Sequence, residues 1–154
     1  MLYSSALWLH SLLRWAVLLT GLVAWFRSIA GATAKRPWGP KDELWGLLFT
    51  VTLDLQFLVG LALYIFISPI TKAAFQNFSV VMSEPIYRYW AVEHIAGMLI
   101  AIALAHVGRV RVRKATGDVR RHRLVMIFFG LALVIIVSSI PWPWFRIGRP
   151  LFPY

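Results

Sequence analysis

The chain has 154 residues, of which 60% are hydrophobic and only 14% are charged, whereas soluble domains carry about 25% charged residues. It holds 16 Lys and Arg against 6 Asp and Glu, a formal net charge of +10, and no cysteine. This composition argues against a soluble globular fold and indicates a membrane protein, and the lack of cysteine excludes disulfides, iron–sulfur clusters and covalent c-type haem attachment.

Four apolar segments are each long enough to cross a bilayer as a helix, which takes about 20 residues. They cover residues 4–27, 44–68, 87–109 and 123–140. Helix-breaking residues separate them, namely Pro37 and Pro40, then Pro69, Pro85 and Gly117. Because no internal repeat or separate polar stretch is visible, residues 1–154 are expected to form a single transmembrane domain.

The basic residues predict how these spans are oriented. The first and third connections carry four and seven basic residues, eleven together: Arg27, Lys35, Arg36, Lys41, Arg109, Arg111, Arg113, Lys114, Arg120, Arg121 and Arg123. The opposite side carries four: Lys72, Arg88, Arg146 and Arg149. Since positive residues accumulate on the cytoplasmic side, both termini are expected on the non-cytoplasmic side of a bacterial inner membrane. Short connections then favour an all-α, up-and-down four-helix bundle.

The four histidines all lie inside or at the edge of a predicted span: His10, His94, His106 and His122. An ionisable side chain in lipid is costly and marks a candidate functional site. At 1.5 Å per residue, His10 lies roughly 9 Å and His94 roughly 10 Å below the outer boundary. A b-type haem iron takes one imidazole on each side, so two imidazoles at one depth suit it. His10 and His94 are therefore the predicted metal ligands.

A second pair, His106 and His122, lies near the cytoplasmic boundary and could hold a second haem. His94 and His106 are twelve residues apart. That spacing rotates them by about 120°, so they cannot face the same neighbouring helix. His122 also belongs to a basic interfacial run, and His106 is close enough to the interface to reach water. One haem b, at His10 and His94, is therefore favoured over two.

Further charged residues accompany the outer pair. Arg14 lies one turn from His10 on the same helix face, and Glu93 adjoins His94. On a functional interpretation, Arg14 binds a haem propionate or polarises a quinone carbonyl, and Glu93 orients an imidazole or accepts a quinol proton. The structural alternatives are an ion pair between Arg14 and Asp54, which offsets the insertion cost of both, and an interfacial position for Glu93.

Four stretches of the chain resemble a known group. Residues 10–15, 55–64, 92–94 and 140–143 are similar to segments of small four-helix membrane proteins of Bacteroidetes-type bacteria that are often called cytochrome b, without a defined reaction. The resemblance implies a bundle in which His10, His94, Arg14 and Glu93 are the characteristic polar residues. The chain departs from the group at Asp54, where members often carry histidine, and at His106, which lacks a counterpart.

Three functions follow from these patterns. The first is a b-type haem protein that passes electrons between a quinone pool and a partner, and so a component of a quinol-linked oxidoreductase. The second is a cofactor-free assembly subunit of a larger membrane complex, such as a respiratory one, which would dock through the aromatic tail at 142–154. The third is a proton or small-molecule conduit along Arg14, Asp54, Glu93 and His94. The expected partner is membrane lipid, and the sequence also allows a homo-oligomer. Nucleic acid is not an expected partner, because lipid headgroups and membrane topology explain the basic charge.

Overall fold

The structure, a computed structural model, describes residues 1–152 and the side chains of all of these except Phe78 and Val80. Within this range the chain forms helices and contains no strand, so the all-α prediction is confirmed. The helices are α1 (Leu2–Thr33), α2 (Pro40–Ala62), α3 (Pro69–Gln76), α4 (Phe78–Ser83), α5 (Pro85–Arg88), α6 (His94–Lys114) and α7 (Asp118–Ser138), with π-helical turns η1 (Leu63–Ile67) and η2 (Tyr89–Glu93).

Four helical stretches are long and apolar enough to cross a membrane, as the sequence predicted. They are Leu2–Thr33, Pro40–Ile67, Pro85–Lys114 and Asp118–Ser138. The first and third extend beyond the predicted bounds at both ends, and the second and fourth begin earlier than predicted, at Pro40 and Asp118. Arg, Lys and Ala at most of these ends are good helix formers. The fourth ends at Ser138 instead of residue 140, because Pro141 disfavours a helical conformation at the residue before it. The fold is therefore that of a multi-pass membrane protein.

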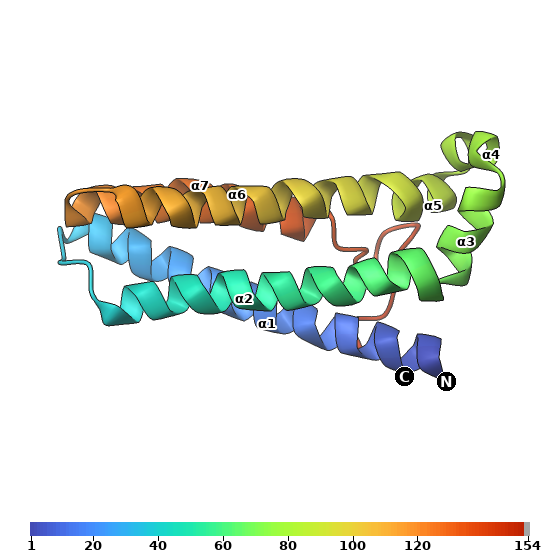
Figure 1. Cartoon of the computed structure of the whole chain (residues 1–154), viewed down its shortest axis with the longest axis horizontal. Helices are drawn as coiled ribbons and strands as arrows, with labels where there is room; N and C mark the ends of the chain where they lie inside the picture. The colour runs from blue at the N-terminus through green and yellow to red at the C-terminus, as the bar shows by residue number, and fades with distance from the viewer. Residues whose placement is uncertain (153–154) are drawn as a thin grey trace.

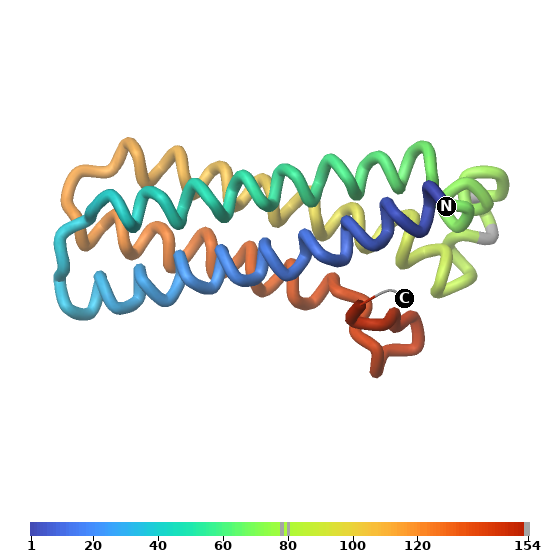
Figure 2. The backbone as a smooth tube through the Cα atoms, turned by 90° about the horizontal axis from the view of Figure 1, so that it is seen from below, coloured from blue at the N-terminus to red at the C-terminus, as the bar shows by residue number. Residues whose placement is uncertain are grey.

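The four long helices lie side by side (Figures 1 and 2). Helix α1 packs on α2 and α7, and α6 packs on α7, whereas the contact between α2 and α6 is slighter. The short α1–α2 and α6–α7 turns lie at one end, shown at the left of Figure 1. The N-terminus, the helices α3 to α5 and the tail that follows α7 lie toward the other end. The two ends of the molecule are thus built from different kinds of segment.

Small residues bring the helices close together in the middle of the structure. A Cβ atom at Gly21 of α1 would lie 2.7 Å from Cε2 of Phe49, so only glycine fits where α1 meets α2. Phe49 packs on Phe129 of α7, with 4.8 Å between ring centroids. Three alanines with no exposed surface lie between α6 and α7: Ala101, Ala105 and Ala132. Close packing of small residues is the usual source of helix association in membranes.

A buried carboxylate holds the α1–α2 turn. Asp42 accepts hydrogen bonds from Arg27 at 2.9 Å and from Arg36 at 2.7 and 3.0 Å, and its side chain is 1% exposed. It also accepts the backbone N–H of Gly39 at 3.1 Å, which caps the start of α2. The hydrogen bond to Asp42 raises the pKa of the Arg36 guanidinium above its ordinary value. This end of the molecule is therefore fixed by charge pairing.

Candidate functional site

Two of the predicted ligands, His10 of α1 and His94 of α6, lie next to each other. Their ring centroids are 6.4 Å apart, and the ring planes are inclined by 70°. For two imidazoles bound on opposite sides of one metal ion, each metal–nitrogen bond is about 2.0 Å and each nitrogen is about 1.1 Å from its ring centre. The two ring centres are then about 6.2 Å apart. The observed separation is therefore compatible with two imidazoles that share one metal ion.

The end of α7 fixes the orientation of His94. Nδ1 of His94 donates to the backbone carbonyl of Ser139 at 2.9 Å, and the Tyr89 hydroxyl donates to the same oxygen at 2.7 Å. This carbonyl is free because the residue four positions on is Pro143, which has no N–H. Since a carbonyl only accepts, the proton of His94 is on Nδ1 and Nε2 keeps its lone pair, which is the arrangement of a metal-binding histidine.

His10 is seated against α2. Its Nε2 accepts a hydrogen bond from the amide Nε2 of Gln56 at 3.2 Å, so its buried Nδ1 carries the proton, and that nitrogen has no partner within residues 1–152. Gly60 leaves room for the ring, because a Cβ there would lie 2.9 Å from Cε1 of His10. A buried nitrogen without a partner costs free energy unless a ligand satisfies it. Sequence reasoning identified His10 but missed the roles of Gln56 and Gly60.

A cavity of about 340 Å³ adjoins the two histidines. Its polar lining is His10, Ser11, Arg14, Gln56, Trp90, His94 and Arg149, and its apolar lining includes Leu53, Met98, Ile136 and Ile140. None of the described residues that line it is Asp or Glu. It is thus a mainly apolar space with two imidazoles and two guanidinium groups on its wall.

The two arginines of the cavity have no carboxylate partner within the described chain. Arg14 donates to the backbone carbonyl of Leu151, and its buried Nε has no partner there. Arg149 donates to the Tyr3 hydroxyl at 3.3 Å, and its guanidinium lies 4.5 Å from the centre of the Trp90 ring. Two cations without acidic partners complement a ligand that carries two carboxylates, as haem does with its propionates.

The tail after α7 closes this end of the molecule. Phe152 stacks on Trp15 of α1 at 5.8 Å between centroids, and Arg149 and Leu151 bond to α1 as described above. The described part of the predicted docking tail at 142–154 is therefore held partly against the bundle, although Trp144 is 70% exposed. Residues 153 and 154 of that tail lie outside the described residues. The role of Arg149 was missed because a tail with prolines has no periodicity to place it.

Two predicted contacts of the outer site are not found in the described chain. Glu93 does not orient His94, because it bonds to Nε of Arg88 at 2.7 Å and its side chain is 50% exposed. Arg14 and Asp54 form no ion pair, because Asp54 instead accepts from His106 at 2.7 Å. Arg14 and Asp54 were expected to lie at similar depths in the membrane, but Arg14 faces the tail, whereas Asp54 faces α6.

The alternative inner pair, His106 and His122, is not brought together by any contact in the described chain. His122 is fully buried, and its Nε2 lies 3.2 Å from the backbone carbonyl of Arg36, with Trp38 packed at 5.0 Å between ring centroids. His106 lies half-exposed beside Asp54, between α6 and α2. His122 packs under the α1–α2 turn because Gly31 leaves space for its ring. The geometry therefore offers a single pair of facing imidazoles in the described chain.

Residues 1–152 hold no group of three or more His, Asp or Glu arranged to hold a metal ion. A haem needs only two axial side chains, because the porphyrin supplies the other four nitrogens. Comparisons with protein-family models, with curated proteins and with solved structures found no match to this chain. Its function is therefore argued from the site itself.

The close fit of Gly60 against His10 gives a first prediction. Gly60→Ala is expected to lower the free energy of unfolding by about 1–3 kcal/mol, because the added methyl group must displace the imidazole. Gly46→Ala on the same helix is the matched control, since its nearest neighbour, Nη1 of Arg109, would lie at an acceptable 3.4 Å. Thermal unfolding in detergent, followed by circular dichroism, measures both. A Gly60→Ala variant as stable as Gly46→Ala would contradict the prediction.

Proposed function

We propose that this chain is a b-type haem protein of the bacterial inner membrane that exchanges electrons with a quinone pool. The observation that carries the proposal is the adjacent pair His10 and His94, whose ring centroids are 6.4 Å apart beside a cavity with no Asp or Glu among its described lining residues. These two histidines would be the axial ligands, and Arg14 and Arg149 would bind the propionates. The resemblance of residues 10–15 and 92–94 to cytochrome b-like proteins agrees with it.

The chain's own residues prepare the site for such a cofactor. A bound haem would supply a one-electron couple at its iron. The Ser139 carbonyl keeps Nε2 of His94 unprotonated, Gly60 leaves room for the ring of His10, and Nε2 of His10 would exchange its hydrogen bond from Gln56 for the haem iron. The rest of the lining is mainly apolar and includes Met98. Such surroundings would help to set the potential of a bound haem.

We further propose an up-and-down four-helix bundle with both termini outside the cytoplasm. The basic residues of the α1–α2 and α6–α7 turns support this orientation. The end that carries those turns also holds Asp42 with its two arginines, an arrangement suited to the cytoplasmic interface. The histidine site then lies near the non-cytoplasmic face. A redox partner would reach it from that side.

The two rival functions have less support from the geometry. For a conduit, Arg14 and His94 line one cavity, but Asp54 bonds to His106 and Glu93 bonds to an exposed arginine, so the four do not form a row. An assembly subunit is favoured by one observation, the exposed Trp144 beside Trp142 on the tail, stacked at 5.2 Å. That alternative predicts a colourless protein that copurifies with larger subunits.

The decisive experiment is the absorption spectrum of the full chain purified from haem-replete cells. We expect a Soret band, a change on reduction with dithionite, and one haem b per chain in a pyridine haemochrome assay. Addition of hemin to the purified chain controls for incomplete loading during expression. A protein that stays colourless after both treatments would overturn the proposal, and two haems per chain would contradict the single site.

A further inference from the structure

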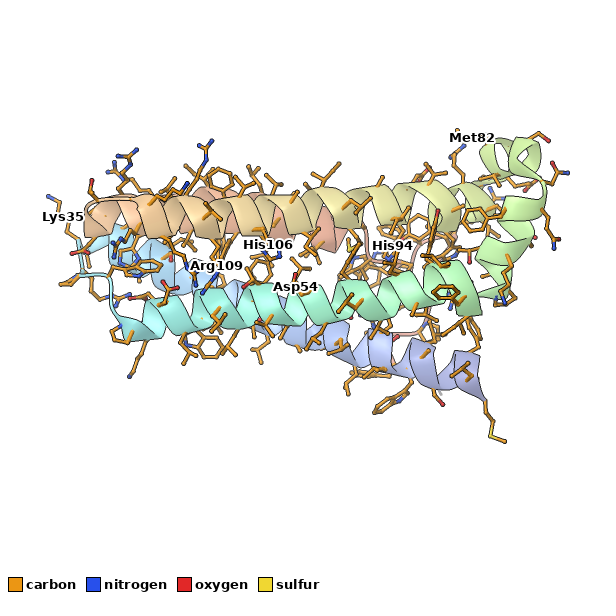
Figure 3. The ribbon with its side chains drawn as sticks, in the orientation of Figure 1. Lys35, Asp54, Met82, His94, His106 and Arg109 are labelled. Carbon is orange, nitrogen blue, oxygen red and sulfur yellow. The ribbon has the colours of Figure 1, made fainter. Side chains whose placement is uncertain are left out.

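An ionisable pair outside the haem site lies between α2 and α6. Nε2 of His106 donates to Oδ1 of Asp54 at 2.7 Å, and the side chains are 48% and 42% exposed. Figure 3 shows the two side chains pointing toward each other from the two helices, between His94 and Arg109. The pair lies where the contact between neighbouring long helices is slightest. It is therefore accessible from the side of the bundle.

The pair lies deep in the apolar part of the structure. Asp54 is eleven residues from Glu43, which bonds to Arg109 at the charged end of the bundle. At 1.5 Å per residue this separation is roughly 16 Å along α2, about half the hydrocarbon thickness. Ionisable side chains at such depth usually face the bundle interior. Because the side chains of His106 and Asp54 are instead partly exposed on the lateral surface, they could bind a ligand that is dissolved in the membrane.

The surroundings of the pair suit a molecule with an aliphatic tail. One turn away on either side of Asp54 are Val51 and Leu58, which are 42% and 60% exposed. One turn from His106 on α6 is Val110, which is 50% exposed. The polar pair is thus surrounded by open aliphatic surface. A ligand bound there would have a polar head at the pair and an apolar tail along these side chains.

The free atoms of the pair determine the chemistry of that head. Since Nε2 of His106 donates to the carboxylate, its Nδ1 has a lone pair, and no described residue bonds to it. The second carboxylate oxygen of Asp54 is likewise an acceptor. Two acceptors bind a hydroxyl group well and a carbonyl oxygen poorly. Among redox-active membrane lipids this favours the reduced form, a quinol, over the quinone.

We infer that His106 and Asp54 form a binding site for the headgroup of a membrane quinol. The quinol hydroxyl donates to Nδ1 of His106, which can take that proton: the O–H bond breaks, an N–H bond forms, and a quinolate remains. The imidazolium that results is stabilised by Asp54, the usual arrangement of a base with its orienting carboxylate. Binding of the quinol does not require the haem. Transfer of electrons from the quinol to a haem held by His94 rests on the proposed function.

Fluorescence quenching of 2-heptyl-4-hydroxyquinoline N-oxide, a hydroxylated quinol analogue, tests this site on the purified chain. We expect saturable binding that decylubiquinol displaces better than decylubiquinone does. Asp54→Asn and His106→Gln should each raise Kd at least tenfold. Leu131→Gln, an equally exposed position on α7, is the matched control and should leave Kd unchanged.

Two additional variants keep the result interpretable. Leu58→Phe fills the exposed surface one turn from Asp54 and should weaken binding without altering the pair, even if the charge variants fold poorly. His94→Ala, which removes a proposed haem ligand, should leave Kd unchanged. A failure of the haem proposal can therefore be distinguished from a failure of the quinol site. Absence of saturable quenching, Kd values in Asp54→Asn and His106→Gln equal to that of the unaltered chain, or a dimer that both variants dissociate would overturn the inference.

Discussion

Replacing His94 by alanine is expected to abolish the Soret absorption of the purified protein. The variant removes the imidazole whose Nδ1 is held by Ser139 and whose Nε2 is left free for a metal ion. His10→Ala should have the same effect, because a low-spin haem needs both axial ligands. We expect less than a tenth of the haem of the unaltered chain, measured as pyridine haemochrome per chain.

Controls separate loss of a ligand from loss of the fold. His106→Ala is the matched variant, since it removes a histidine from the same helix and should keep a full complement of haem. Added imidazole should partly restore the spectrum of His94→Ala, because the deleted side chain leaves space for it. Full haem content in both His10→Ala and His94→Ala would rule out these two residues as the ligands.

Removal of the buried carboxylate at Asp42 is expected to be the most destabilising single change to the fold. Asp42→Ala leaves Arg27 and Arg36 without their partner and the start of α2 without its cap. Breaking a buried pair by removing one partner costs about 3–5 kcal/mol, and we expect the lower end because both arginines are partly exposed. Thermal or denaturant unfolding in detergent measures the loss.

The neighbouring acid provides the control for this prediction. Glu43 also bonds to two arginines, Arg109 at 3.0 Å and Arg113 at 3.6 Å, but its side chain is 43% exposed. Surface pairs of this kind contribute only about 0–1 kcal/mol, so Glu43→Ala should change stability little. If Asp42→Ala proved no more destabilising than Glu43→Ala, burial of the α1–α2 turn would not be the stabilising feature described above.

The existence and approximate bounds of the four long helices could be predicted from the sequence because the signals are local. A run of about 20 apolar residues is sufficient to identify a membrane-length helix, and prolines such as Pro69 and Pro141 mark the breaks. The exact ends could not be predicted, since basic residues continue α6 to Lys114 beyond its apolar part. The helices α3 and α4 have no such strong pattern.

From the sequence, the candidate site could be predicted only in one respect, the depth of each side chain in the membrane. Depth follows from residue counts, and it brought His10 and His94 to the same level. Which face of a helix a residue occupies depends on how the helices are rotated against one another, and this is why Asp54 is next to His106 instead of Arg14. Gln56 and Gly60 stand out in the sequence as a polar residue and a glycine within the second span, but their contact with His10 depends on how α1 and α2 are rotated against each other.

The tail at 139–152 has a consequence for the order in which the protein matures. Ser139, Arg149 and Leu151 all contribute to the histidine cavity or its surroundings, and all are synthesised after the last of the four long helices. In the proposed topology the ribosome delivers this tail across the membrane only after α7 is inserted. In that topology the cavity would be completed only after the tail has crossed the membrane, and a cofactor that arrived earlier would meet a cavity without Arg149.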